Sequence, residues 1–67
     1  MPRLYNAKHI LKTLEKYDFV VVSQKGSHLK LKKEHHTVIV PMHSKEIPVG
    51  TFRSIVRQSG LDKEIFR

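Results

Sequence analysis

The hydrophobic and polar positions of this chain follow a helical period near both ends and a strand period in between. From residue 7 to about residue 17, apolar side chains recur three and four positions apart, which predicts an amphipathic helix capped by Asn6. A second stripe of the same spacing, carried by Phe52, Ile55 and Val56, predicts a helix that Gly60 can close. Pro48 suits the first turn of that second helix, with Thr51 as the alternative cap.

The segment between these helices is predicted to form three short strands. Residues 19–24 are aromatic and β-branched, residues 28–33 alternate, and residues 37–40 are β-branched again. The first two are joined by a hairpin tip at Lys25 and Gly26, because glycine adopts positive φ at little cost. Pro41 lacks an amide hydrogen and is expected at the end of the third strand or at an edge.

These elements predict an α+β fold of order α-β-β-β-α, in one domain that spans residues 1–67. Short links favour a three-stranded antiparallel sheet, and both helices are expected on one face because each must bury its stripe. Residues 42–47 are expected to form a connecting loop. The segment 61–67 either adds a helical turn or stays a tail, and its Ile65 and Phe66 either join the core or meet a partner.

The alternation in residues 28–33 sorts the side chains of the middle strand by chemistry. Leu29 and Leu31 point to one face, while His28, Lys30 and Lys32 point to the other. If the leucines face the core, an imidazole stands on the open face beside two ammonium groups. Such a face attracts polyanions, and an imidazole is well suited to proton transfer at neutral pH.

The net charge of the chain indicates which class of molecule it binds. The chain of 67 residues carries 13 Lys and Arg against 6 Asp and Glu, a formal charge of +7. Nucleic acid is the expected partner, because the basic amphipathic helix that would favour a membrane surface is not evident. Cysteine is absent and no apolar run approaches the roughly 20 residues of a membrane span. A cytoplasmic location is therefore expected.

No metal or cofactor is expected from the sequence. His35, His36 and His43 are close in the chain, but adjacent strand residues point oppositely and no carboxylate falls at a ligand-like spacing. The acidic residues are scattered singly, whereas two-metal nuclease chemistry needs clustered carboxylates. The glycines are too far apart for a phosphate-cradling loop.

Several motifs, taken in order, resemble the HicA family of bacterial and archaeal toxins. They are Gln-Lys-Gly-Ser-His at 24–28, Val-Ile-Val-Pro-Met-His at 38–43, Pro-Val-Gly-Thr-Phe-Arg-Ser-Ile at 48–55 and Ser-Gly-Leu at 59–61. The resemblance covers about residues 6–61. The loop 44–49 departs from it, because relatives often have glycine where this chain has Ser-Lys-Glu-Ile-Pro.

The resemblance implies a fold similar to the double-stranded RNA-binding domain, in agreement with the order of elements. It implies the toxin of a type II toxin–antitoxin pair, a messenger-RNA endonuclease that inhibits growth, with His28 as its catalytic residue. It also implies that a HicB-type antitoxin holds the enzyme inactive. Any binding of the pair to DNA is then expected to reside in the antitoxin.

In the expected chemistry the neighbouring 2′-hydroxyl of RNA attacks the phosphorus without a metal, and His28 acts as general base or acid. Lys25, Ser27, Lys30 and Lys32 are expected to contact the RNA, the lysines through phosphate. A second catalytic group is either His35, His36, His43 or none of them.

Two other functions compete with this one. A non-catalytic module that binds double-stranded RNA needs basic residues on helix and loop and no histidine. Its contacts would include Lys8, Lys12 and Lys16 with Arg53 and Arg57. The basic surface would alternatively serve as the docking site of an acidic protein.

Overall fold

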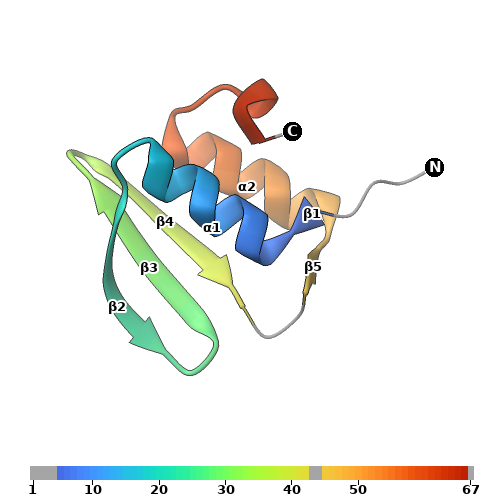
Figure 1. The fold of residues 1–67 in the computed structure, drawn as a ribbon, viewed down its shortest axis with the longest axis horizontal. Helices are drawn as coiled ribbons and strands as arrows, with labels where there is room; N and C mark the ends of the chain where they lie inside the picture. Colours follow the sequence, from blue (N-terminus) through green and yellow to red (C-terminus); the bar gives the residue numbers. More distant parts are fainter. Residues whose placement is uncertain (1–4, 43–44, 67) are drawn as a thin grey trace.

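A computed structural model describes residues 5–42 and 45–66 of the chain. The expected order of helix, three strands and helix is confirmed, with short extra elements before α1, between β4 and α2, and after α2 (Figure 1). The elements are β1 (Tyr5–Asn6), α1 (Ala7–Lys16), β2 (Val20–Lys25), β3 (His28–Lys33), β4 (His36–Pro41), β5 (Glu46–Ile47), α2 (Val49–Ser59) and the 3₁₀ turn η1 (Lys63–Phe66).

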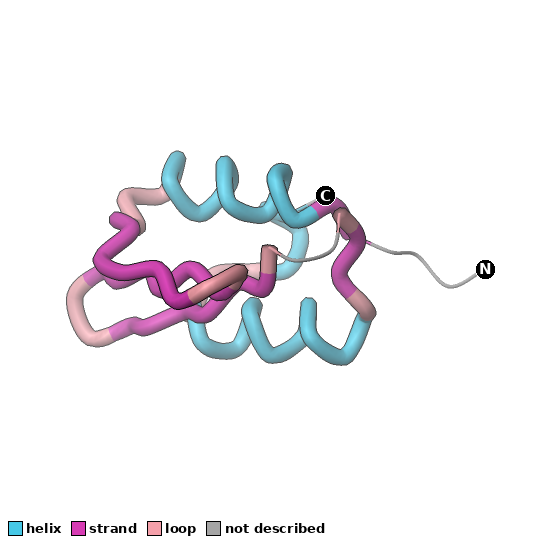
Figure 2. Tube along the Cα trace, turned by 90° about the horizontal axis from the view of Figure 1, so that it is seen from below, coloured by secondary structure: helices cyan, strands magenta, loops and turns pink. Residues whose placement is uncertain are grey.

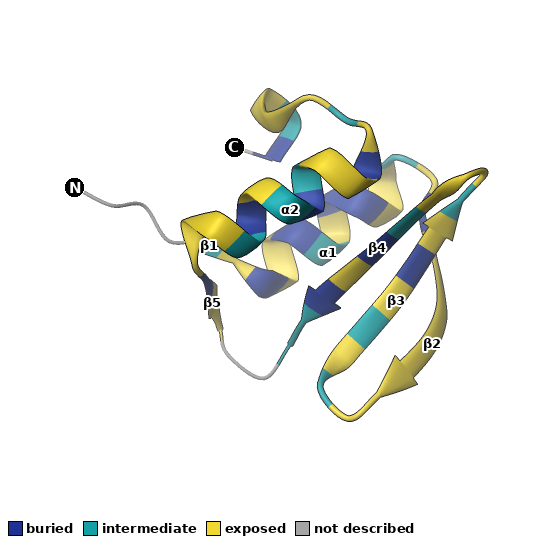
Figure 3. Cartoon of the chain, turned by 180° about the vertical axis from the view of Figure 1, so that it is seen from behind, coloured by how far each residue is buried: buried dark blue, intermediate teal, exposed yellow. Residues whose placement is uncertain are grey.

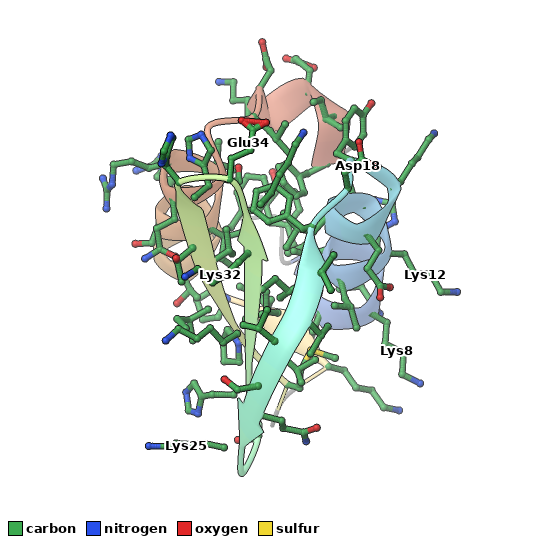
Figure 4. The ribbon with its side chains drawn as sticks, turned by 90° about the vertical axis from the view of Figure 1, so that its left-hand side faces the viewer. Lys8, Lys12, Asp18, Lys25, Lys32 and Glu34 are labelled. Carbon is green, nitrogen blue, oxygen red and sulfur yellow. The ribbon has the colours of Figure 1, made fainter. Side chains whose placement is uncertain are left out.

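The sheet β2-β3-β4 is antiparallel throughout, with β3 in the middle. Figure 4 looks onto its open face and shows α1 and α2 behind it, so both helices cover the same face, as expected. Their axes run roughly parallel to one another (Figure 2). The helices pack chiefly on β4 and on the inward side chains of β3.

The core lies between the helices and this inner face of the sheet. The side chain of Asn6 caps α1, where its Oδ1 accepts hydrogen bonds from the amides of Lys8 at 2.9 Å and His9 at 3.1 Å. Of the second predicted stripe, Phe52 and Ile55 are buried and Val56 is half-buried. The buried hydrophobic residues are Ala7, Ile10, Leu14, Phe19, Leu31, Val38, Val40, Ile47, Phe52, Ile55 and Phe66.

The first hairpin loop lies one residue further along the chain than predicted, and the second, expected at residues 34–36, is one residue shorter than predicted. Gly26 and Ser27 form the first loop, with Gly26 at φ +56°, as a type II′ turn requires of its first central residue. Glu34 occupies the equivalent position of the second loop at φ +53°. His36, expected in a connection, is instead the first residue of β4 because it pairs with Lys33.

The end of the connecting loop predicted at 42–47 is a short strand, contrary to expectation, and residues 43 and 44 of that loop lie outside the described residues. Glu46 and Ile47 form β5, which pairs antiparallel with β1, and the amide of Ala7 donates to the carbonyl of Lys45 at 2.9 Å. Tyr5 of β1 stacks on Phe52 of α2 with ring centroids 3.7 Å apart. The sequence carries no signal for this pairing, since a two-residue ladder has no period to detect.

The segment after α2 joins the core. Phe66 in η1 is fully buried and meets Phe52 edge to face, with centroids 5.7 Å apart. The Nε2–H of His9 in α1 donates to the carbonyl oxygen of Phe66 at 3.0 Å. Of the alternatives left open by the sequence, Phe66 therefore takes the core position.

One strand differs from its prediction more than the others. The run of β-branched residues at the start of β2 is typical of a strand that packs against a neighbouring element. Instead every residue of β2 is exposed, while Phe19 just before it is buried. The reason is that the helices cover β3 and β4, and a bulge between Val21 and Ser23 disrupts the pairing of the edge strand with β3.

The second helix is bounded by backbone geometry at both ends. It begins at Val49, directly after Pro48, so neither Pro48 in the first turn nor Thr51 as cap is correct. Gly60 closes it in the left-handed region at φ +72°, as predicted. The ring of His36 lies over Gly60, and its Nδ1–H donates to the carbonyl of Gln58 at 3.2 Å.

No helix in the described parts of the chain has the length and apolar character needed to cross a membrane.

Gly60→Ala should destabilise the protein more than Gly26→Ala. Both glycines have positive φ, which costs a β-carbon about 1–2 kcal/mol. At Gly60 the new Cβ would also lie 2.6 Å from the His36 ring, whereas nothing lies within 4 Å at Gly26. Urea unfolding should show an additional loss of about 0.5–1.5 kcal/mol for Gly60→Ala, because the exposed His36 ring must move and gives up its hydrogen bond to Gln58.

A matched double variant separates the two causes. In a His36→Ala background the contact is gone, so Gly60→Ala should then cost about as much as Gly26→Ala. An equal cost of Gly60→Ala in both backgrounds would show that the ring does not constrain this position.

Phe66→Ala should lower the free energy of unfolding by about 3–5 kcal/mol, since it empties a fully buried aromatic position. Lys63→Ala, in the same turn but exposed, should change it by less than about 0.5 kcal/mol. Urea denaturation of both variants checks this. Equal midpoints would mean that η1 is not part of the cooperative unit.

Candidate functional site

His28 stands at the start of β3, on the face of the sheet away from the helices. Its cross-strand partners are Lys25 on β2 and Pro41 on β4, and its side chain is exposed. The turn before His28 is hydrogen-bonded to the residue that follows β4, because the amide of Met42 donates to the carbonyl of Ser27. The backbone that carries His28 is therefore held by both neighbouring strands.

The predicted lysines lie on the same face as His28. Lys30 is placed between Ser23 and Ile39, and Lys32 between Val20 and Thr37. Lys25 faces His28 directly across the β2–β3 ladder, a position in which Cβ atoms are about 4.5–5.5 Å apart. Leu31 on the opposite face is fully buried, so the expected sorting of β3 into a basic face and a core face is confirmed.

Two hollows meet at His28. One, of about 200 Å³, is lined by residues of β2, β3 and β4, namely Ser23, Lys25, His28, Lys30 and Ile39. The other, of about 380 Å³, lies between the sheet and α2 and is lined by His28, Ile39, Pro41, Thr51, Ser54, Ile55 and Gln58. His28 and Ile39 belong to both, so a bound chain that fills either hollow meets the imidazole.

The sequence did not lead us to predict that α2 forms one wall of the larger hollow. Thr51, Ser54 and Gln58 project from one face of the helix at spacings of three and four. This stripe of polar residues beside the buried stripe of the same helix was the feature of the sequence that could have predicted the wall. Gln58 also covers the outer edge of β4, because its Oε1 accepts from the amide of Ile39 at 3.4 Å.

The other histidines are not grouped with His28. His35 and His36 lie at the far end of the β3–β4 hairpin, about 17 Å away for five residues of strand. His36 is engaged with α2, and His9 with Phe66. His43, the remaining candidate for a second catalytic group, lies outside the described residues.

Charge is distributed unevenly along the sheet. Asp18 precedes β2 and Glu34 follows β3, so both lie at the end opposite Lys25 and His28 (Figure 4). Within the described parts of the chain, no group of three or more histidine, cysteine or acidic side chains has the geometry to hold a metal ion. Among the described residues, those that line the two hollows at His28 are cationic or neutral.

Fold and surface together define a small basic α+β domain of the α-β-β-β-α class with a histidine on its open sheet face. Residues 7–61 match the family model described as "HicA toxin of bacterial toxin-antitoxin". The match spans most of the chain, which therefore belongs to the HicA toxin family and is the toxin half of a toxin–antitoxin system. No curated protein matches the chain. Membership in this family implies pairing with an antitoxin.

Proposed function

We propose that this toxin is an endoribonuclease that cleaves messenger RNA with His28 as its catalytic residue. The observation that carries the proposal is the position of His28 where two hollows meet, with Lys25 opposite it and Lys30 on the same face. A single-stranded polyanion that enters either hollow meets an imidazole and at least one ammonium group. The chain belongs to a family of toxins, and cleavage of messenger RNA would explain why such a protein is toxic.

The chemistry follows from groups within one face. The neighbouring 2′-hydroxyl attacks the phosphorus while His28 accepts its proton. The new bond joins the 2′-oxygen to phosphorus and the bond to the 5′-oxygen breaks, which leaves a 2′,3′-cyclic phosphate and a 5′-hydroxyl. Lys25 and Lys30 are placed to stabilise the additional negative charge on the phosphoryl oxygens. This scheme requires no metal ion from the protein.

The proton for the leaving oxygen does not come from His35 or His36, because both lie at the other end of the hairpin. The imidazolium formed at His28 or a bound water delivers it. Ser27 contributes through its carbonyl, which anchors the turn, and its position beside His28 makes it a phosphate contact. Lys32, one pleat beyond Lys30, contacts the flanking phosphate.

We infer that the antitoxin is of the HicB type and that the toxin acts in the cytoplasm, where messenger RNA is translated. The antitoxin keeps the toxin inactive by denying RNA access to the His28 face. Any DNA contact of the pair is made by the antitoxin.

His28→Ala should lower the rate of RNA cleavage at least a hundredfold, since a placed general base contributes about 10²–10⁴. His35→Ala, which alters another exposed histidine at the far end of the sheet, is the matched control and should retain activity within about threefold. Cleavage of a mixed RNA is followed in excess EDTA, with circular dichroism to verify folding.

Three outcomes would contradict this proposal. Loss of activity in EDTA would assign the chemistry to a metal. A folded His28→Ala variant that cuts as well as the wild type would remove His28 from the reaction. Undiminished binding of RNA with no cleavage by either protein would indicate a binding module.

Lys30→Ala and Lys32→Ala should each weaken binding of a short single-stranded RNA and reduce its dependence on salt. Each phosphate contact contributes about 0.7 to the slope of log K against log salt. Fluorescence anisotropy in the inactive His28→Ala background measures this slope without cleavage. Lys63→Ala, in η1, is the control and should leave the slope unchanged. Equal slopes for all variants would mean that the sheet lysines do not contact phosphate.

A further inference from the structure

The outer strand β2 exposes apolar side chains that the proposed chemistry does not use. All its residues are exposed, and Val20, Val21 and Val22 retain 61%, 39% and 51% of their accessible surface (Figure 3). Val20 shares the open face with Lys32, whereas Val21 faces the helix side opposite Leu31. The valines therefore present apolar surface on both sides of the same edge.

The two edge strands of the sheet, β4 and β2, differ in whether another element covers their outer edge. The outer edge of β4 is covered by α2, where Gln58 accepts the amide of Ile39. No other described strand pairs with the outer edge of β2. An uncovered edge strand with apolar side chains is a template for one more strand, which makes main-chain hydrogen bonds and fills the adjacent apolar positions.

Charge around this edge determines which strand fits it. Lys8 and Lys12 of α1 lie on the side of the free edge and Lys25 lies at the end of β2, whereas the single acid Asp18 lies just before its start (Figure 4). A second copy of this chain would bring a formal charge of +7 against another +7. An extended segment that alternates apolar with acidic residues would instead match both the valines and the lysines.

We propose that the outer edge of β2 is the docking site of an extended acidic and apolar segment of the antitoxin, which adds to the sheet as a fourth strand. The antitoxin is the occupant because the family pairs with one and because the net charge of +7 on each copy disfavours a second toxin at this edge. This docking site does not depend on the nuclease chemistry proposed above.

Its effect on activity does rest on that proposed function. A strand added to β2 lies about 4.8 Å beyond it. It therefore borders the hollow of Ser23, Lys25 and His28 on the side away from β4. Acidic side chains of the added strand would pair with Lys25, which removes that lysine from the RNA site.

Hydrogen exchange tests the docking directly. The toxin is compared alone and bound to the antitoxin with which it is co-expressed and purified. The amides of residues 20–24 should exchange at least tenfold more slowly in the complex. Protection confined to β3, β4 or α2 would overturn the proposal.

A paired substitution tests the apolar contribution. Val20→Thr with Val22→Thr keeps β-branched side chains in the strand but removes apolar surface. The antitoxin dissociation constant should rise at least tenfold, while Val49→Thr, at a valine of 44% exposure on α2, should change it less than twofold. Equal effects of both substitutions would overturn the proposal.

RNA cleavage by the variants distinguishes a failure of the docking site from a failure of the nuclease chemistry. RNA cleavage by the Val20→Thr, Val22→Thr variant should stay within threefold of the wild type. If the wild type does not cleave RNA, the docking site is still judged by exchange and affinity. Concentration-dependent dimers of the toxin alone, abolished by the threonines, would assign the edge to a second copy and overturn the proposal.

Discussion

The two-residue period of β3 is the constraint on which the rest of the structure depends. As the middle strand it cannot shift by one residue without placing Leu31 in solvent and a lysine in the core. Because Leu31 is fixed inward, His28, Lys30 and Lys32 are fixed outward on one face. Core packing and the composition of the candidate site are therefore set by the same register.

Elements with a sustained period were predictable, and elements held by tertiary contacts were not. Both helices, the middle strand and the closing Gly60 follow from spacing and backbone preference in the sequence. The β1–β5 ladder does not, because Tyr5 and Ile47 meet only when the fold is assembled. The exposure of Val20 was also unpredictable, since a run of valines is the same whether or not a helix covers it.

The candidate site shows the same division. His28 and its lysines share a strand or a turn, so local alternation was enough to group them. The wall formed by Thr51, Ser54 and Gln58 comes from a helix more than twenty residues away and required the packing of α2 beside β4. Local sequence also left His36 open as a catalytic group, whereas its ring is committed to the end of α2.

The burial of Phe66 has a consequence for the order in which the protein is made. Synthesis proceeds from the amino end, so α1 and the sheet leave the ribosome before the residue that fills the space beside Phe52. His9 lacks the carbonyl it binds until the same moment. The nascent toxin therefore cannot complete its core until residue 66 has left the ribosome. The folded toxin forms only after the residues of its candidate functional site have all been translated.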